Sequence, residues 1–370
     1  MKKVTSGGFA VAEAVKLCKP QVLAMYPITP STFIPEKLSE YVAQGEMDAE
    51  LIGVESEFSA ISALVGASAT GVRTFTATSS QGLALMHEIL FAASGMRLPI
   101  VMAIVNRALS APLNIWNDQQ DSISERDNGW IQLYVENNQE AVDTIIQCFK
   151  IAEDRQVLLP VMMCMDGFFL SHTYEPVDIP ESVSAFLPDY QPVLYLDPER
   201  PMTQGAWASP DYYQEFRKEV SKAIENSRET IVRVNDEFGK IYGRKYGDGL
   251  VETYGDSDTV VVSLGSICGS LKEVADKKGF EVLRVRSFRP FPKKEIERAL
   301  AGKKEVIVLE KNVSLGTNSG ALFCEIRAIA RDAKTVNIIS GLGGKDITLA
   351  NIEKFVDNSK NMKDGETLWM

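Results

Sequence analysis

Three polar side chains in the first third of the sequence stand where chemistry could take place. Glu57 opens a stretch of small and apolar residues, Thr29 lies between two prolines, and Arg107 follows a continuous apolar run. A carboxylate can exchange a proton, a threonine presents a hydroxyl, and an arginine can bind a carboxylate through two parallel hydrogen bonds. Histidine is scarce, with only His87 and His172. Acid–base chemistry would therefore fall mainly to carboxylates or to a cofactor.

Predicted strands position two of these side chains. Thr29 follows an expected strand at 21–25, and Arg107 follows an expected strand at 98–105. The second of these runs is apolar throughout, as in a parallel strand that is covered on both faces. In open α/β sheets, ligands bind at the carboxyl ends of the strands. A ligand site and a structural role are both compatible with these positions: Thr29 would otherwise be an N-cap or turn residue, and Arg107 would belong to a surface ion pair.

The stretch that contains Glu57 has the clearest local pattern. Small and apolar residues recur at helical spacing from 60 to 67, which predicts a helix with a buried stripe. Gly71 marks its end, a strand is expected at 72–78, and a polar turn at 78–82 opens a second helix. A carboxylate at the mouth of a helix with such small side chains indicates that a group approaches closely from outside. The alternative is that its charge only complements the helix dipole.

Strand and helix patterns alternate along the remaining chain, which predicts two α/β domains. The first is expected at 1–240, with an extended, proline-rich arm near 170–215, and the second at 255–370. A linker is expected at 244–258. The segment 114–130 is rich in amides and carboxylates, which is typical of an ordered surface loop that serves a site or an interface.

Composition narrows the class of protein. The net charge of −11 argues against a general affinity for nucleic acid or anionic lipid. No apolar run approaches the roughly 20 residues that span a bilayer. Glu13 and Lys16 would fall inside the apolar core of a signal peptide, so we expect a soluble, cytoplasmic protein. The five cysteines lack CxxC spacing, so we expect no zinc or iron–sulfur ligands in this chain.

Five segments resemble, in order and spacing, the alpha subunits of the 2-oxoacid:ferredoxin oxidoreductase family, which includes pyruvate:ferredoxin oxidoreductase. They are YPITPST (26–32), VESEFSA (54–60), FTATSSQGLALM (75–86), NRALSAPLNIWNDQQD (106–121) and LRVRSFRPFP (283–292). The resemblance implies that residues 1–240 form the pyrimidine-binding domain of a thiamine-diphosphate enzyme. Residues 255–370 would then form a smaller α/β domain of the transketolase carboxy-terminal type.

The resemblance also implies roles for the polar side chains. Glu57 matches the glutamate that hydrogen-bonds the aminopyrimidine ring of the cofactor and shares a proton with its ring nitrogen. Thr29 and Arg107 match the threonine and arginine that orient the carboxylate and keto oxygen of the 2-oxoacid. Pro30 belongs to the same matched loop as Thr29, and Glu57, Thr29 and Pro30 are expected to contact the cofactor.

The implied reaction is the oxidative decarboxylation of pyruvate with coenzyme A to acetyl-CoA and carbon dioxide, with electrons passed to ferredoxin, in either direction. The triplet Gly247-Asp248-Gly249 begins like a diphosphate-binding signature, but no asparagine follows at the required distance. Diphosphate and Mg²⁺ would therefore be held by a partner subunit, and [4Fe-4S] clusters would also lie in partner subunits. The expected assembly is a hetero-oligomer with beta, gamma and delta type subunits.

Three alternatives stay open at this stage. The substrate could be a branched-chain 2-oxoacid such as 2-oxoisovalerate, because a partner chain would share the pocket for its side chain. The chain could instead belong to a thiamine enzyme that moves no electrons, against which the segment 106–121 argues. It could also be a non-catalytic scaffold subunit, but a scaffold has no need of Glu57, Thr29 and Arg107 together.

Overall fold

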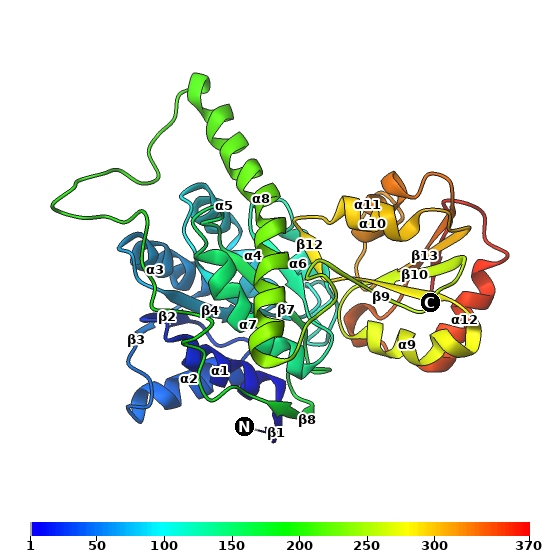
Figure 1. Ribbon diagram of the computed structural model, residues 1–370, viewed down its shortest axis with the longest axis horizontal. Coiled ribbons are helices and arrows are strands. Elements are labelled where there is room, and N and C mark those ends of the chain that lie inside the picture. The colour runs from blue at the N-terminus through cyan, green and yellow to red at the C-terminus, as the bar shows by residue number, and fades with distance from the viewer. Residues whose placement is uncertain (1) are drawn as a thin grey trace.

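Two main sheets, each with helices on both faces, build the chain (Figure 1). The computed structural model describes residues 2–370. The first sheet contains β2 (Val22–Met25), β3 (Glu50–Gly53), β4 (Thr74–Thr78), β5 (Val101–Asn106), β6 (Ile131–Tyr134), β7 (Val161–Asp166) and β12 (Ser287–Arg289). Its order is β12-β6-β7-β5-β4-β2-β3, with β12 antiparallel to β6 and the other neighbours parallel. The predicted α/β fold class is confirmed.

The second sheet comes from the carboxy-terminal part of the chain. It contains β9 (Val251–Tyr254), β10 (Thr259–Ser263), β11 (Glu281–Val285), β13 (Glu305–Glu310), β14 (Lys334–Ile339) and β15 (Thr367–Trp369). The order is β15-β14-β13-β10-β11-β9, and β9 runs antiparallel to β11. The expectation of a simple linker at 244–258 is wrong in part, because β9 lies inside it. A four-residue strand is too short to give a recognisable pattern. A further pair, β1 (Lys2–Ser6) and β8 (Tyr174–Asp178), is antiparallel.

Helices connect the parallel strands, as crossover connections require. Those packed with the first sheet are α1 (Gly7–Cys18), α2 (Phe33–Ala43), α3 (Glu57–Ala69), α4 (Ser80–Leu85), α5 (His87–Gly95), α6 (Gln120–Ser124), α7 (Asn138–Ala152) and α8 (Pro210–Tyr242). Those of the second are α9 (Ile267–Lys278), α10 (Lys293–Leu300), α11 (Ala321–Ile329), the short η1 (Leu342–Gly344) and α12 (Leu349–Ser359). Among residues 2–370, no helix combines the length and the apolarity needed to cross a bilayer.

Strand β5 explains why the run 98–105 is apolar throughout. Val101, Ala103 and Val105 pack in one hydrophobic core with residues of α1 and α7. Met102 and Ile104 point to the opposite face and pack in a second core with residues of α3 and α5. Because side chains of a strand alternate between faces, burial on both faces demands an apolar residue at every position. The prediction of a strand covered on both faces is confirmed.

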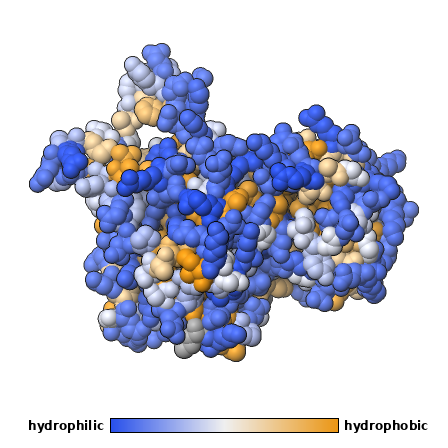
Figure 2. Space-filling view, in the orientation of Figure 1, coloured by the Kyte–Doolittle hydropathy of each residue, from blue (hydrophilic) through white to orange (hydrophobic). Residues whose placement is uncertain are grey.

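An arm, residues 189–216, leaves the body of the molecule and returns as the projecting first turns of α8 (Figure 1). It exposes many large hydrophobic side chains: Val193, Leu194, Tyr195, Leu196, Met202, Trp207, Tyr212, Tyr213 and Phe216. Figure 2 shows hydrophobic residues gathered at the base of the arm. Exposed apolar residues concentrated in one segment are typical of a surface that binds another protein.

A buried group of charges joins the two sheets. Glu140, in the first turn of α7, accepts hydrogen bonds from Arg284 Nη2 at 3.1 Å and from Arg286 Nε at 2.9 Å. All three side chains are at most 1% exposed. Arg284 lies on β11 and Arg286 directly follows it, just before β12 adds a strand to the first sheet. Part of the segment 283–292, on which the family resemblance rests, therefore holds the two sheets together.

Replacing Glu140 by glutamine should lower the free energy of unfolding by about 3–5 kcal/mol, because loss of one partner leaves buried charges uncompensated. Burial favours the protonated acid, but the two guanidinium groups outweigh it and hold the pKa of Glu140 below its ordinary value. The contribution should therefore be full above the ordinary pKa of glutamate and disappear as the pH falls through the lowered pKa. Guanidinium chloride unfolding at several pH values measures both effects.

Glu252→Gln is the matched control for Glu140→Gln. Glu252 also pairs with Arg284, at 2.9 Å, but its side chain is 30% exposed. Partly exposed ion pairs contribute only about 0–1 kcal/mol. Equal losses of stability in the two variants would show that burial of Glu140 is not what matters.

Candidate functional site

The predicted site residues lie just after the ends of strands, at one edge of the first sheet. Thr29 follows β2, Glu57 directly begins the helix after β3, and Arg107 follows β5. The strands β3, β2, β4 and β5 are parallel neighbours. Their carboxyl ends therefore meet at the same edge, which is where open α/β sheets bind ligands.

Arg107 is a buried cation whose guanidinium forms no ion pair with a described residue. Its side chain is 7% exposed. The guanidinium donates from Nη1 to Thr29 O at 2.9 Å and from Nε to Asn114 O at 3.0 Å. Among residues 2–370, no carboxylate lies within ion-pair distance of it and Nη2 has no hydrogen-bond partner. Burial lowers the pKa of Arg107, yet an arginine keeps its charge in proteins. The alternative of a surface ion pair is wrong, and the free N–H groups suit an incoming anion.

Thr29 contacts Arg107 through its backbone and not through its side chain. Its carbonyl accepts the hydrogen bond from Arg107, while its side chain is exposed. Thr29 does not cap α2, whose N-cap residue is Thr32. Pro30, joined to Thr29 by a cis peptide bond, is buried against Gly167, where an added Cβ would lie 2.7 Å from Pro30 Cγ. The structure thus brings together two of the predicted substrate and cofactor residues, Thr29 and Arg107.

Glu57 is a nearly buried carboxylate that no protein group binds. It is 6% exposed, and among residues 2–370 it has neither a hydrogen bond nor an ion pair. It lies in the first turn of α3, so the helix dipole does favour its charge. Gly82 of α4 packs directly on it: a Cβ there would lie 2.4 Å from Glu57 Oε1 and 2.5 Å from Thr78 Oγ1. A buried carboxylate is costly unless a donor satisfies it, so a ligand is the expected partner.

The turn beside Glu57 contributes polar groups that sequence reasoning did not single out. Thr78 Oγ1, Ser79 Oγ and Gln81 Nε2 are buried without a hydrogen-bond partner in the described part of the chain. The signal was present as the polar turn at 78–82, directly after a strand. Another missed residue is Asp121, which is buried and bonds the backbone N–H of Arg107 at 2.9 Å.

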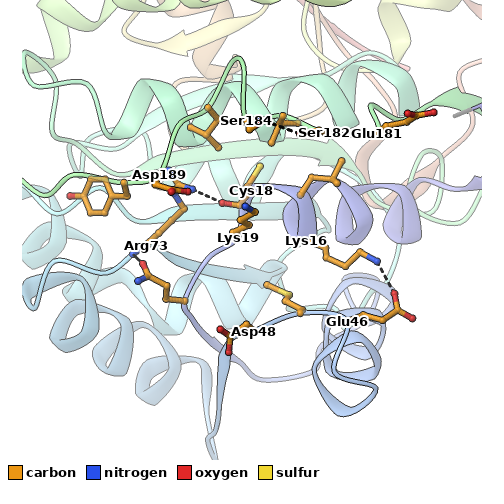
Figure 3. A pocket seen from close by; sticks show the side chains of 16 residues that line it. Lys16, Cys18, Lys19, Glu46, Asp48, Arg73, Glu181, Ser182, Ser184 and Asp189 are labelled. Carbon is orange, nitrogen blue, oxygen red and sulfur yellow. Dashed lines mark hydrogen bonds and ion pairs between the residues drawn. The ribbon is translucent and has the colours of Figure 1, made fainter.

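A cavity of about 560 Å³ lies away from these residues. Figure 3 shows that its walls include the end of α1 and the segment 181–190, near the amino ends of the strands. Two of its three cations are engaged with the protein: Lys16 binds Glu46 at 2.8 Å, and Arg73 Nη2 binds Glu153 at 2.7 Å. Cavity size therefore does not locate the candidate site in this chain; unpaired polar groups do.

The fold and the site define an α/β protein that presents a free carboxylate and an unpaired arginine at the carboxyl edge of a parallel sheet. Two family profiles match the chain. Residues 13–236 match "Pyruvate flavodoxin/ferredoxin oxidoreductase, thiamine diP-bdg", and residues 257–352 match "Pyruvate:ferredoxin oxidoreductase core domain II". The chain belongs to the pyruvate:ferredoxin oxidoreductase family, and the family predicted from the sequence is confirmed.

Individual relatives cover the chain along its whole length. Pyruvate synthase subunit PorA of Methanocaldococcus jannaschii is 56% identical over 378 residues, which cover 100% of this chain and 97% of the relative. Ketoisovalerate oxidoreductase subunit VorA of Pyrococcus abyssi is 46% identical over 375 residues, covering 98% and 94%.

A solved structure supports the fold. It is the 2-oxoglutarate:ferredoxin oxidoreductase of Magnetococcus marinus with 2-oxoglutarate, coenzyme A and succinyl-CoA bound, and it matches with a TM-score of 0.72 at 19% identity. The match covers 97% of this chain and 65% of that chain.

Proposed function

We propose that this chain is the alpha subunit of an enzyme that oxidatively decarboxylates pyruvate with coenzyme A to acetyl-CoA and carbon dioxide. Electrons pass to ferredoxin, and the reaction runs in either direction. The observation that carries the proposal is the buried, unpaired guanidinium of Arg107 at the sheet edge, because it suits the carboxylate of a 2-oxoacid. The higher identity to the pyruvate synthase relative, 56% against 46% for the ketoisovalerate relative, favours pyruvate over a branched-chain substrate.

The residues around Glu57 fit the ring of thiamine diphosphate. The carboxylate of Glu57 has no protein partner, Thr78 Oγ1 is buried without one, and Gly82 keeps the space above them free of a side chain. Thiamine diphosphate, when bound, supplies the carbon nucleophile and accepts the electron pair that remains when carbon dioxide leaves.

The protein residues bind and orient the reactants. Glu57 accepts a hydrogen bond from the ring of the cofactor and exchanges that proton with it. Arg107 binds the carboxylate of the 2-oxoacid, and the hydroxyl of Thr29 donates to its keto oxygen. Pro30, held against Gly167, fixes the loop that carries Thr29. These groups come from separate strand ends, so the sheet itself sets their relative positions.

Partner subunits complete the enzyme in this proposal. They hold the diphosphate, Mg²⁺ and [4Fe-4S] clusters, and we infer subunits of the beta, gamma and delta types. The contacts of Asp248 support the placement of Mg²⁺ in a partner subunit. Asp248 Oδ1 accepts from Leu250 N and Val251 N, both at 2.8 Å, so this carboxylate stabilises its own turn. The exposed aromatic residues of the arm support contact with another subunit.

A substrate panel on the assembled complex, with a redox dye as electron acceptor, tests the proposal. Pyruvate should give the highest kcat/KM in the presence of coenzyme A. A preference for 2-oxoisovalerate would move the substrate to the branched-chain class. No reduction of the dye with any 2-oxoacid would exclude a catalytic subunit.

The isolated chain should bind thiamine diphosphate weakly or not at all, because only the residues for the ring lie here. Adding Mg²⁺ should change little, since its ligands are placed in a partner. Calorimetry on the isolated chain and on the assembled complex measures the difference. Tight, Mg²⁺-dependent binding by the chain alone would contradict the division of the cofactor site between subunits.

A further inference from the structure

Asp121 is a buried carboxylate that ties together several backbone segments at the edge where Arg107 lies. It is 2% exposed, and its two oxygens accept four hydrogen bonds. Oδ2 accepts from the backbone N–H groups of Ser80 and Arg107, both at 2.9 Å. Oδ1 accepts from Asn106 Nδ2 at 2.7 Å and from Ser122 N at 2.8 Å. Every acceptor position that faces the protein is therefore used.

The bond to Ser80 reaches the turn that covers Glu57. Ser80 begins α4 with φ +48°, in the left-handed region that residues other than glycine seldom adopt. Its N–H is bonded to Asp121, and its hydroxyl donates to a carbonyl on the Arg107 loop. Two residues later, Gly82 packs on the carboxylate of Glu57. Asp121 thus fixes both the turn over Glu57 and the backbone of Arg107.

The three residues before Asp121 in the sequence bond the second sheet and its loops. Asp118 Oδ2 accepts from Gly343 N at 3.1 Å, Gln119 N donates to Lys311 O at 2.8 Å, and Gln120 Oε1 accepts from Val313 N at 2.9 Å. These contacts join the segment 117–120 to the second sheet. Asp121, directly after this segment, bonds the backbone N–H groups of Ser80 and Arg107 instead.

We propose that Asp121 is a positioning residue that fixes the position of Arg107 relative to the turn over Glu57. It thereby places the carboxylate of the substrate correctly relative to the ring of the cofactor. The inference rests on the proposed function. Asp121 acts through the backbone of Arg107 and Ser80, and it contacts neither substrate nor cofactor.

Asp121→Asn in the assembled complex tests the inference. An asparagine keeps one oxygen, but its amide nitrogen would face one of the two pairs of donors. KM for pyruvate should rise about tenfold or more, since a binding group misplaced by an ångström can cost on the order of 100-fold. KM for coenzyme A and iron–sulfur content should not change. A variant that only loosened the fold would alter all of these together.

The double exchange Asn106→Asp with Asp121→Asn is the rescue. The new amide at 121 would donate to the new carboxylate at 106, and its oxygen would still accept from Ser80 N and Arg107 N. Ser122 N would lose its acceptor, while the Ser122 hydroxyl, which accepts from Asn106 Nδ2 in the wild type, would donate to the new carboxylate. The total charge of the pair is unchanged. KM for pyruvate should return most of the way to the wild-type value.

Asp118→Asn is the matched control, because Asp118 is also buried, 5% exposed, and lies in the same segment. Its KM for pyruvate should match the wild type. If Asp121→Asn assembles and its KM for pyruvate is unchanged, the inference is overturned while the proposed function stands. If Asp121→Asn does not assemble, the double exchange decides: wild-type KM supports the inference, and a raised KM or failure to assemble overturns it. A wild-type complex inactive on pyruvate would overturn the proposed function itself.

Discussion

Glu57→Gln should lower kcat of the assembled complex by about 10²- to 10⁴-fold, the usual contribution of a general acid–base group. Glutamine matches the shape of glutamate, so it still fits beneath Gly82, but an amide cannot exchange a proton with the ring of the cofactor. Because Glu57 has no protein partner among the described residues, the substitution breaks no hydrogen bond in the chain. Assembly and thermal stability should therefore be retained.

Steady-state kinetics with pyruvate and a redox dye, together with thermal unfolding, measure both parts of this expectation. Glu55→Gln is the control: Glu55 stands two residues earlier, is exposed, and bonds Ser59 Oγ at the surface. Its kcat should stay near the wild-type value. If Glu57→Gln were nearly as active as the wild type, Glu57 would be no more than a charge that complements the start of α3.

The sequence was sufficient to predict features that depend on local patterns. The apolar run at 98–105 predicts β5 because burial on both faces leaves no polar position in the strand. Thr29 and Arg107 could be placed at one edge because each lies within a few residues of the end of an expected strand, and parallel strands bring their carboxyl ends together. The contact between Arg107 Nη1 and Thr29 O, at 2.9 Å, agrees with that placement.

Features made by distant segments could not be predicted in the same way. Asp121 gains its position from Ser80, Asn106 and Arg107, which no spacing in the sequence connects to it. The sequence pattern does not predict strand β6, because the strand has only four residues and includes the buried Gln132, whose amide donates to Ser122 O at 2.7 Å. A polar residue that finds a partner only after folding looks like a loop residue beforehand.

The segment 283–292 shows a different limit of prediction from the sequence. It supports the family resemblance, yet the sequence alone does not reveal what the arginines in it bind. Arg284 and Arg286 surround Glu140, more than 100 residues earlier, and are almost completely buried. Basic residues are expected at the surface, so their burial depends on a carboxylate that only the folded chain brings to them.

Arg107→Lys should raise KM for pyruvate on the order of 10- to 100-fold, and Arg107→Ala should raise it further, because a charge-assisted hydrogen bond to a buried partner contributes about 1.5–3 kcal/mol. In the structure, Nε and one N–H of Nη1 hold the carbonyls of Asn114 and Thr29. The second N–H of Nη1 and both of Nη2 remain for the carboxylate of the substrate. Lysine has a single ammonium group and cannot bind the two carbonyls and both oxygens of the substrate carboxylate at the same time.

Arg97→Lys separates this role from structural support. Arg97 also donates to two backbone carbonyls, Leu158 O at 3.1 Å and Val157 O at 2.6 Å, but it precedes β5 and so lies at the opposite edge of the sheet from Arg107. The two lysine variants lose equivalent carbonyl contacts, yet only Arg107→Lys should raise KM for pyruvate. Arg107→Lys should also discriminate less between 2-oxoacids and aldehydes that lack the carboxylate. An unchanged KM with a lower kcat would mean that Arg107 acts on the chemical step or on the structure, and that another group binds the carboxylate of the substrate.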